Sequence, residues 1–206
     1  MSEEARRPAV FLDRDGTLSA EADWVTKAVD LGLLPFAAQA IATLSRAGYA
    51  VVLATNQSAV ARGLITEREL AEIHAHMARE LARGGARLDG VYTCPHHPSE
   101  GSAPYRRECE CRKPKPGMLL AAARDLGLDL RRSWVIGDAE RDLAAGAAAG
   151  VRGILVATGK GEAEFERMGR EGRAPERFVS DVLAAAQAIV AAAQHAPSGT
   201  PGSRRS

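Results

Sequence analysis

The chain has 206 residues, 46% of them hydrophobic, and its 27 basic and 26 acidic residues leave a formal net charge of +1. This length suits one domain with a substantial buried core. The even charge balance disfavours a nucleic-acid or anionic-membrane surface, and the N-terminal sequence lacks the apolar core of a signal peptide, so we expect a cytoplasmic protein.

Short apolar runs alternate with helical patterns along the chain. The runs expected to form strands are residues 9–12, 49–54, 90–93, 134–136 and 153–157. They are apolar throughout, which is typical of parallel strands that are buried on both faces. The helical patterns cover residues 35–47, 66–81, 116–126, 140–149 and 181–193. This alternation predicts an α/β fold with a doubly wound parallel sheet.

Three regions do not follow the alternation. Residues 19–34 are too few for a separate cap domain, and residues 95–116 are rich in Pro, His, Cys and charge. Residues 160–177 are charged and contain glycine, which is typical of a surface loop with a helical piece. We therefore expect one domain over residues 1–195 without a large cap, followed by a disordered tail over residues 196–206.

Polar residues directly follow four of the five predicted strands. They are Asp13-Arg14-Asp15-Gly16-Thr17, Thr55-Asn56-Gln57-Ser58, Cys94-Pro95-His96-His97 and Gly137-Asp138. The carboxyl ends of parallel strands lie at one edge of the sheet, where ligands bind in such folds. The carboxylates of Asp13, Asp15 and Asp138 would suit Mg²⁺, while Thr55 and Asn56 would suit phosphate oxygens.

Each of these groups also has an ordinary structural explanation. An Asx turn explains the residues from Asp13 to Gly16, because Asp and Gly are common after strands. Lys113 taken alone would be a solvated surface cation. His74 and His76 lie in a predicted helix, and we expect them on its surface rather than at a metal.

All three cysteines of the chain lie in the loop of residues 94–111. Three thiolates and one imidazole suit a structural zinc ion, which takes four ligands in a closed tetrahedron. The ligands would be Cys94, His96, Cys109 and Cys111. His97 is the alternative imidazole, and unrelated free thiols are the alternative to a metal site. A zinc-stapled loop would hold the neighbouring Arg112 and Lys113 in place.

Four segments resemble the sequential motifs of the haloacid dehalogenase (HAD) superfamily. They are FLDRDGTL, ATNQS, RKPKPGM and VIGDAERD, and their order and strand placement match over about residues 9–159. The resemblance implies a HAD-like Rossmannoid fold and a magnesium-dependent phosphatase. It makes Asp13 the nucleophile that forms an aspartyl-phosphate, and Asp15 the general acid and base.

The same resemblance assigns the remaining catalytic roles. Mg²⁺ would be held by the carboxylate of Asp13, the backbone carbonyl of Asp15 and the carboxylate of Asp138. Thr55, Asn56 and Lys113 would surround the phosphate oxygens, where negative charge is stabilised in the transition state. Asp142 would orient Lys113 or a metal-bound water.

The segment CPHHP followed by CECRKPKPGM narrows the resemblance to two related families, the D-glycero-D-manno-heptose 1,7-bisphosphate 7-phosphatases and the histidinol-phosphate phosphatases. TNQSAVARG is closer to TNQSGIARG of the heptose branch, because the histidinol branch has an acidic residue where Ser58 stands. Lys160 in ATGKG also fits the heptose pattern. The implied substrate contacts are Glu21, Trp24, Thr55, Asn56, Gln57, Ser58, Arg112 and Lys113.

Three places along the chain depart from the heptose pattern, and they leave the identity of the substrate undecided. Ser19, Asp23-Trp24-Val25 and Ala139 stand where the family commonly has Asn, Gly-Tyr-Val and Lys. We expect a monomeric enzyme acting on a phosphorylated sugar, without a nucleic-acid or membrane partner. Histidinol phosphate is the alternative substrate, and a catalytically inactive, metal-stapled binding module is the alternative of another class.

Overall fold

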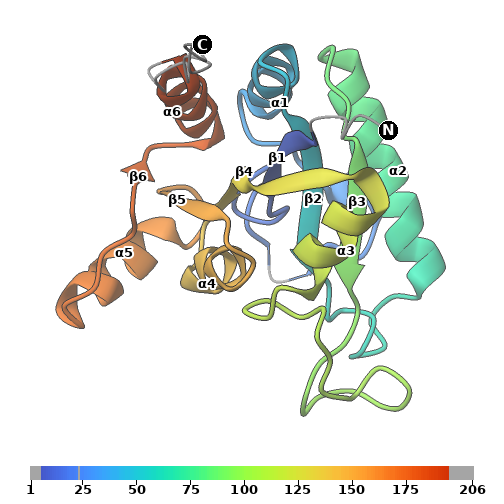
Figure 1. The fold of residues 1–206 in the computed structure, drawn as a ribbon. Coiled ribbons are helices and arrows are strands. Elements are labelled where there is room, and N and C mark those ends of the chain that lie inside the picture. Colours follow the sequence, from blue (N-terminus) through green and yellow to red (C-terminus); the bar gives the residue numbers. More distant parts are fainter. Residues whose placement is uncertain (1–5, 23, 195–206) are drawn as a thin grey trace, which may run out of the picture.

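The computed structural model describes residues 6–22 and 24–194. Its strands are β1 (Arg7–Leu12), β2 (Ala50–Asn56), β3 (Gly90–Cys94), β4 (Leu128–Gly137), β5 (Arg152–Val156) and β6 (Phe178–Val179). They form one six-stranded parallel sheet in the order β3-β2-β1-β4-β5-β6 (Figure 1). The helices are η1 (Ala28–Asp30), α1 (Ala37–Arg46), α2 (Glu67–Arg83), α3 (Gly117–Leu126), α4 (Glu140–Ala148), α5 (Gly161–Arg170) and α6 (Val182–Gln194).

Helices cover both faces of this sheet. On one face α1, α2 and α6 pack over Val10 and Leu12 of β1. On the other face α3 and α4 pack over the intervening residues Ala9 and Phe11. Successive strand residues point to opposite faces, so a strand covered on both sides is apolar at every position. The predicted doubly wound α/β fold is confirmed.

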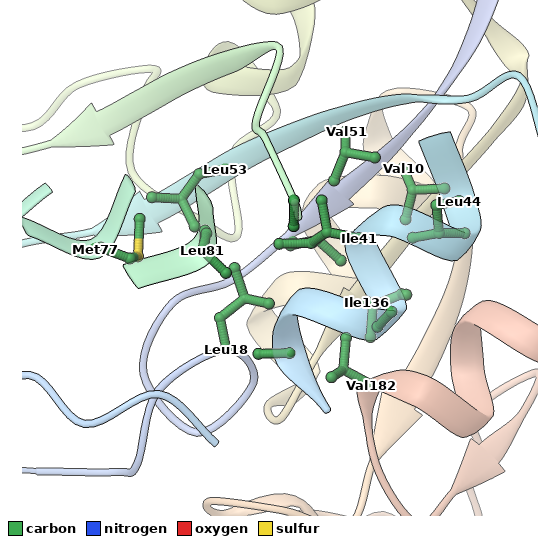
Figure 2. Packing of buried hydrophobic residues seen from close by; sticks show 14 of the residues in the cluster. Val10, Leu18, Ile41, Leu44, Val51, Leu53, Met77, Leu81, Ile136 and Val182 are labelled. Carbon is green, nitrogen blue, oxygen red and sulfur yellow. The ribbon is translucent and has the colours of Figure 1, made fainter. Parts of the chain in front are cut away.

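The larger of the two cores also anchors the loop that follows β1. Figure 2 shows Leu18 of this loop among Ile41 and Leu44 of α1 and Met77 and Leu81 of α2. All five side chains are fully buried. Burying a side chain of this size contributes about 1.5–3 kcal/mol. The loop that carries the first polar motif is therefore fixed to the core directly after that motif.

The strand order changes direction at β1, which lies between β2 and β4. From β1 the chain proceeds to β2 and β3 on one side, and then returns to β4, β5 and β6 on the other. Ligands bind at such a switch point, outside the carboxyl ends of the strands. Asp13, Asn56 and Asp138 all lie at or just beyond the ends of these three central strands.

Several elements differ in extent from the sequence prediction. β4 begins at Leu128 instead of residue 134, because it continues past a register shift opposite Pro8 and Val10 of β1. α1 begins at Ala37, after Phe36 in a left-handed conformation with φ 67°. The region of residues 160–177 contains α5 and is followed by β6, a two-residue strand that was not predicted.

Residues 19–22 and 24–34 contain isolated bridges from Ser19 to Asp15 and Leu33 and the 3-10 turn η1. The tail predicted to be disordered, residues 196–206, lies outside the described residues, and the division into one domain and a tail stays a prediction. Among the described helices, none has the length and hydropathy needed to cross a membrane.

Candidate active site

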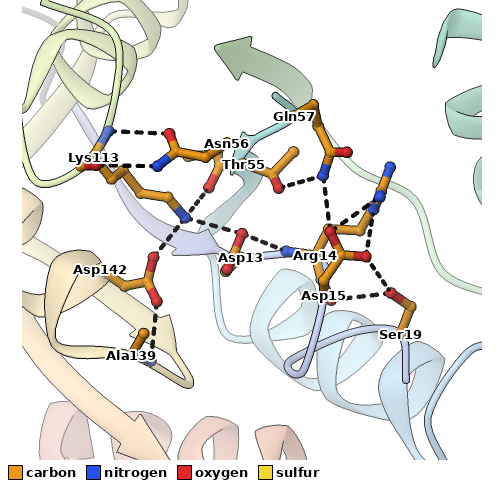
Figure 3. A network of polar contacts seen from close by, with 11 residues as sticks. Asp13, Arg14, Asp15, Ser19, Thr55, Asn56, Gln57, Lys113, Ala139 and Asp142 are labelled. Carbon is orange, nitrogen blue, oxygen red and sulfur yellow. Dashed lines mark hydrogen bonds and ion pairs between the residues drawn. The ribbon is translucent and has the colours of Figure 1, made fainter. Parts of the chain in front are cut away.

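A buried ion-pair network lies at the ends of the central strands. The ammonium of Lys113 is 2.9 Å from Asp13 Oδ1 and 2.6 Å from Asp142 Oδ1, and it donates to the carbonyl of Ala54 at 2.7 Å (Figure 3). The three charged side chains are at most 5% exposed. The four segments involved are far apart in sequence, and the network therefore depends on the sheet order.

Burial and pairing act in opposite directions on these charges. Burial by itself would raise the pKa of Asp13, but the charge and hydrogen bond of Lys113, together with Arg141 and the backbone N–H of Arg14, hold the pKa below its ordinary value. Burial would likewise lower the pKa of Lys113, but Asp13 and Asp142 raise it. At neutral pH, Asp13 is therefore an ionised carboxylate, as a nucleophile must be.

Asn56 holds the backbone of Lys113 in position. Its side-chain amide donates to the Lys113 carbonyl at 3.0 Å and accepts from the Lys113 backbone N–H at 3.0 Å. The predicted role of Asn56 was to bind phosphate oxygens. In this structure its amide nitrogen and oxygen are both engaged with Lys113, which makes it a positioning residue for that lysine.

A second network fixes the carboxylate of Asp15. Arg14 binds it in a bidentate manner, with Nε to Oδ1 at 2.9 Å and Nη2 to Oδ2 at 3.0 Å. Gln57 Nε2 donates to Oδ2 at 2.9 Å and to Thr55 Oγ1 at 2.9 Å. Ser19 Oγ adds a contact of 3.3 Å to Oδ1. Gln57 and Thr55 thus link the end of β2 to the loop after β1 (Figure 3).

The sequence did not indicate a role for Arg14, which is 1% exposed. Its Nη1 lies 3.3 Å from Nε2 of His74 on α2, which makes Nε2 the acceptor. Burial, with the charge of Arg14 beside it, lowers the pKa of His74 to about 4. His74 was expected at the helix surface; it is instead half-buried and neutral at pH 7, and it braces Arg14.

A third set of residues suits a divalent cation. Carboxylate oxygens of Asp13, Asp138 and Asp142 all lie within 4.8 Å of one another. Asp138 Oδ1 is buried without a hydrogen-bond partner among the described residues. Burial, reinforced by the charges of Asp13 and Asp142, raises the pKa of Asp138 to about 7. A hard cation with oxygen ligands would use this oxygen and offset the repulsion.

Two glycines make room for the Asp138 carboxylate. A Cβ added at Gly16 would lie 2.1 Å from Asp138 Oδ2, and one added at Gly159 would lie 2.3 Å from it. Both glycines also have positive φ, at +77° and +62°. The loops after β1 and β5 therefore approach Asp138 more closely than any side chain would allow.

Several residues of these networks line a cavity of about 150 Å³. The expected catalytic and substrate residues that line it are Asp13, Asp15, Glu21, Trp24, Thr55, Asn56, Gln57, Ser58 and Arg112. Lys113 and Asp138 lie buried behind Asp13 and do not line the cavity. Lys160 lines it and pairs with Glu21 at 2.6 Å. Arg141 also lines it, and the sequence did not indicate it.

One wall of the cavity is connected to the cysteine loop. Trp24 is 43% exposed, and the guanidinium of Arg62 lies 4.8 Å from its ring centroid. Arg62 also pairs with Glu100 of the loop at 2.6 Å. At Gly101 an added Cβ would lie 1.7 Å from the Ala61 carbonyl, so the two backbones touch directly.

The cysteine loop brings its four predicted ligands together. The Sγ atoms of Cys94, Cys109 and Cys111 are 3.3–3.6 Å apart, and His96 Nδ1 is 3.3 Å from Cys111 Sγ. Thiolates that share a tetrahedral zinc at about 2.3 Å lie slightly farther apart than this. His97 Nδ1 instead accepts from two backbone N–H groups of its own loop. The geometry fits a metal and selects His96 over His97.

Comparisons with known proteins identify the family. A model of the HAD-hydrolase-like family matches residues 110–186. The D-glycero-beta-D-manno-heptose-1,7-bisphosphate 7-phosphatase of Photorhabdus laumondii is 44% identical over 154 residues, which cover 74% of this chain and 82% of that one. The enzyme of the same name from Rhodopseudomonas palustris is 46% identical over 149 residues, covering 72% and 83%.

Solved structures agree with this assignment. The D,D-heptose 1,7-bisphosphate phosphatase of B. bronchiseptica, complexed with magnesium and phosphate, superposes with a TM-score of 0.79 at 39% identity, covering 90% of this chain and 99% of that one. The corresponding Burkholderia thailandensis structure has a TM-score of 0.65 at 34% identity, covering 89% and 99%. The predicted resemblance is confirmed: this chain belongs to the D-glycero-beta-D-manno-heptose-1,7-bisphosphate 7-phosphatase family of HAD-like hydrolases.

Proposed function

We propose that this protein removes the 7-phosphate from D-glycero-D-manno-heptose 1,7-bisphosphate through an aspartyl-phosphate on Asp13. The observation that carries the proposal is the Asp13 carboxylate, which lines the cavity and is kept ionised by Lys113. The family supports the sugar, and the relatives' names specify the β anomer.

The first step is attack by an Asp13 oxygen on the phosphorus of the 7-phosphate. The new O–P bond forms as the bond to the sugar oxygen breaks, and Asp15 supplies the proton that the leaving oxygen needs. Thr55 and Gln57 line the cavity with Asp13 and would contact the phosphate oxygens. The buried ammonium of Lys113, 2.9 Å from Asp13 Oδ1, would offset the negative charge at this point. Arg14 and Gln57 orient Asp15 for this transfer.

The second step is hydrolysis of the aspartyl-phosphate. Asp15, now ionised, takes a proton from water, and the resulting attack on phosphorus releases Asp13 and inorganic phosphate. Mg²⁺, held by Asp13, the Asp15 carbonyl and Asp138, would supply the positive charge that lets an anionic carboxylate approach an anionic phosphate. The unpartnered Asp138 oxygen supports this ligand set.

The cysteine loop has a structural role in this proposal. Cys94, His96, Cys109 and Cys111 hold zinc, with no position left for a substrate. Arg112, which donates to the His96 carbonyl at 3.0 Å, and Lys113 directly follow the last ligand, so the metal fixes the start of the segment that reaches Asp13. Free thiols and bound zinc suit a reducing compartment, and we therefore place the reaction in the cytoplasm.

The test is phosphate release with Mg²⁺ from both anomers of heptose 1,7-bisphosphate and from histidinol phosphate. We expect the highest kcat/KM for a heptose bisphosphate. Preference for histidinol phosphate would overturn the proposal that the substrate is a heptose bisphosphate. Asp13→Asn is expected to abolish turnover, and activity near wild type in that variant would overturn the covalent mechanism. Failure of the wild type on every phosphate ester would favour the binding-module alternative.

A further inference from the structure

Arg141 is the cation of the cavity whose guanidinium has no bonding partner. It lines the cavity next to Asp13 and Lys160, and it is solvent-exposed. Over residues 6–22 and 24–194, its guanidinium makes neither a hydrogen bond nor an ion pair. The other cations lining the cavity are engaged: Arg14 with Asp15, Arg112 with the His96 carbonyl and Lys160 with Glu21.

The carboxylates around Arg141 favour its charged form and raise the pKa of its guanidinium, although the start of a helix does not favour a cation. Arg141 lies in the first turn of α4, between Glu140 and Asp142. The helix dipole places partial positive charge at this end, which favours acidic and disfavours basic side chains. The negative charges of Asp142 and Asp13 attract it, but neither carboxylate pairs with it. Its five N–H donors therefore remain available to a ligand in the cavity.

A sugar bisphosphate brings two phosphates of about −1.5 to −2 charge each into this cavity. The phosphate that reacts lies at Asp13, where Lys113 and the metal site offset its negative charge. The phosphate that stays on the sugar needs a separate cation farther out. An arginine matches phosphate oxygens with two parallel N–H···O bonds, which a lysine cannot do.

We propose that Arg141 binds the phosphate that remains on the sugar and so sets the preference for a bisphosphate over a monophosphate. The inference rests on the proposed function, because it takes the reacting phosphate to lie at Asp13. Arg141 is then a specificity-determining residue rather than part of the chemical step.

The test compares heptose 1,7-bisphosphate with heptose 7-phosphate, which lacks the second phosphate. Arg141→Gln is expected to lower kcat/KM for the bisphosphate about 50-fold, and to leave the monophosphate within about twofold. Arg141→Lys keeps the charge but loses the planar pair of N–H donors. Its kcat/KM for the bisphosphate is therefore expected to lie between the values of the wild type and Arg141→Gln. Arg170→Gln, an exposed arginine at the end of α5, is the matched control.

An equal loss on both substrates would overturn the inference, because Arg141 would then act on the reacting phosphate. No loss on the bisphosphate would also overturn it. If wild-type enzyme disfavours heptose substrates altogether, the proposed function fails instead. The ratio between fructose 1,6-bisphosphate and fructose 6-phosphate, measured in the same variants, then still decides the role of Arg141.

Discussion

The ammonium of Lys113 lies 2.6 Å from Asp142 Oδ1, closer than its 2.9 Å contact with Asp13. Asp142 also accepts the backbone N–H of Ala139 at 3.1 Å, which ties the network to the start of α4. One buried cation thus compensates two buried carboxylates. Removing it would leave both without a partner charge, the costliest arrangement in a protein interior.

Lys113→Met is expected to lower the free energy of unfolding by about 3–5 kcal/mol at pH 8, since it leaves Asp13 and Asp142 uncompensated. Adding Asp142→Asn is expected to restore part of this loss, because one of the unpaired charges is removed. Urea unfolding of the single and double variants measures both effects. Lys115→Met is the control, at an exposed lysine whose partners are also exposed, and is expected to have little effect on the free energy of unfolding. Equal losses at the two lysines would contradict the buried network.

The raised pKa of Asp138 predicts a pH dependence of stability. The pKa is about 7 in the folded chain against 3.8 for the ordinary side chain. The stability gained by protonating Asp138 is therefore fully present below pH 3.8 and is lost as the pH rises through 7. In Mg²⁺-free buffer we expect about 1 kcal/mol more stability at pH 6 than at pH 8 from this group.

Asp138→Asn is expected to lack that difference between pH 6 and pH 8, because its amide does not titrate. Urea titrations of both proteins at the two pH values provide the measurement. The same dependence in the variant would assign the effect to another group. Since the cation site needs the ionised carboxylate, Mg²⁺ affinity of the wild type is expected to weaken towards pH 6.

The cysteine loop predicts different outcomes for its two adjacent histidines. His96→Ala is expected to lose bound zinc, because it removes one of four ligands, whereas His97→Ala is expected to retain about one zinc per chain. Elemental analysis of protein purified without added metal reports the content directly. Absence of zinc from the wild type would exclude the site. Loss of zinc from His97→Ala alone would make His97 the ligand in place of His96.

The close approach of Gly159 to Asp138 predicts a defect in metal binding. Gly159→Ala is expected to displace the Asp138 carboxylate and to weaken Mg²⁺ affinity at least about tenfold, because the added Cβ has no space. Gly150→Ala is the matched control: φ is +73° there, but nothing lies within 4 Å of the added Cβ. It carries only the backbone strain of about 1 kcal/mol. Titration of activity with Mg²⁺ separates the two, and equal affinities would contradict the crowding.

The sequence predicted the fold class and the gathering of polar residues at the strand ends, because buried parallel strands and the polar residues after them leave a direct pattern. It did not predict β6, since a two-residue strand has no periodicity to detect. The charged stretch before it also hid the fact that its backbone pairs with β5.

Roles that depend on which atom contacts which neighbour could not be predicted from the sequence. Asn56 was recognised as a site residue, but its engagement with the Lys113 backbone follows from the pairing of distant segments. Arg14 and His74 are 60 positions apart, and only the packing of α2 brings them together. Arg141 stands three residues beyond Asp138, yet its orientation towards the cavity depends on where α4 begins.

Arg62 contacts Trp24 and Glu100, so one wall of the cavity is connected to the cysteine loop rather than to the sheet. Asp13 directly follows strand β1, whereas Trp24 and Arg62 in this wall of the cavity belong to loops, one of which contacts the cysteine loop. We expect substitutions in those loops to alter the shape offered to a sugar without moving Asp13. The architecture therefore allows related enzymes to diverge in substrate while the reaction itself is inherited unchanged.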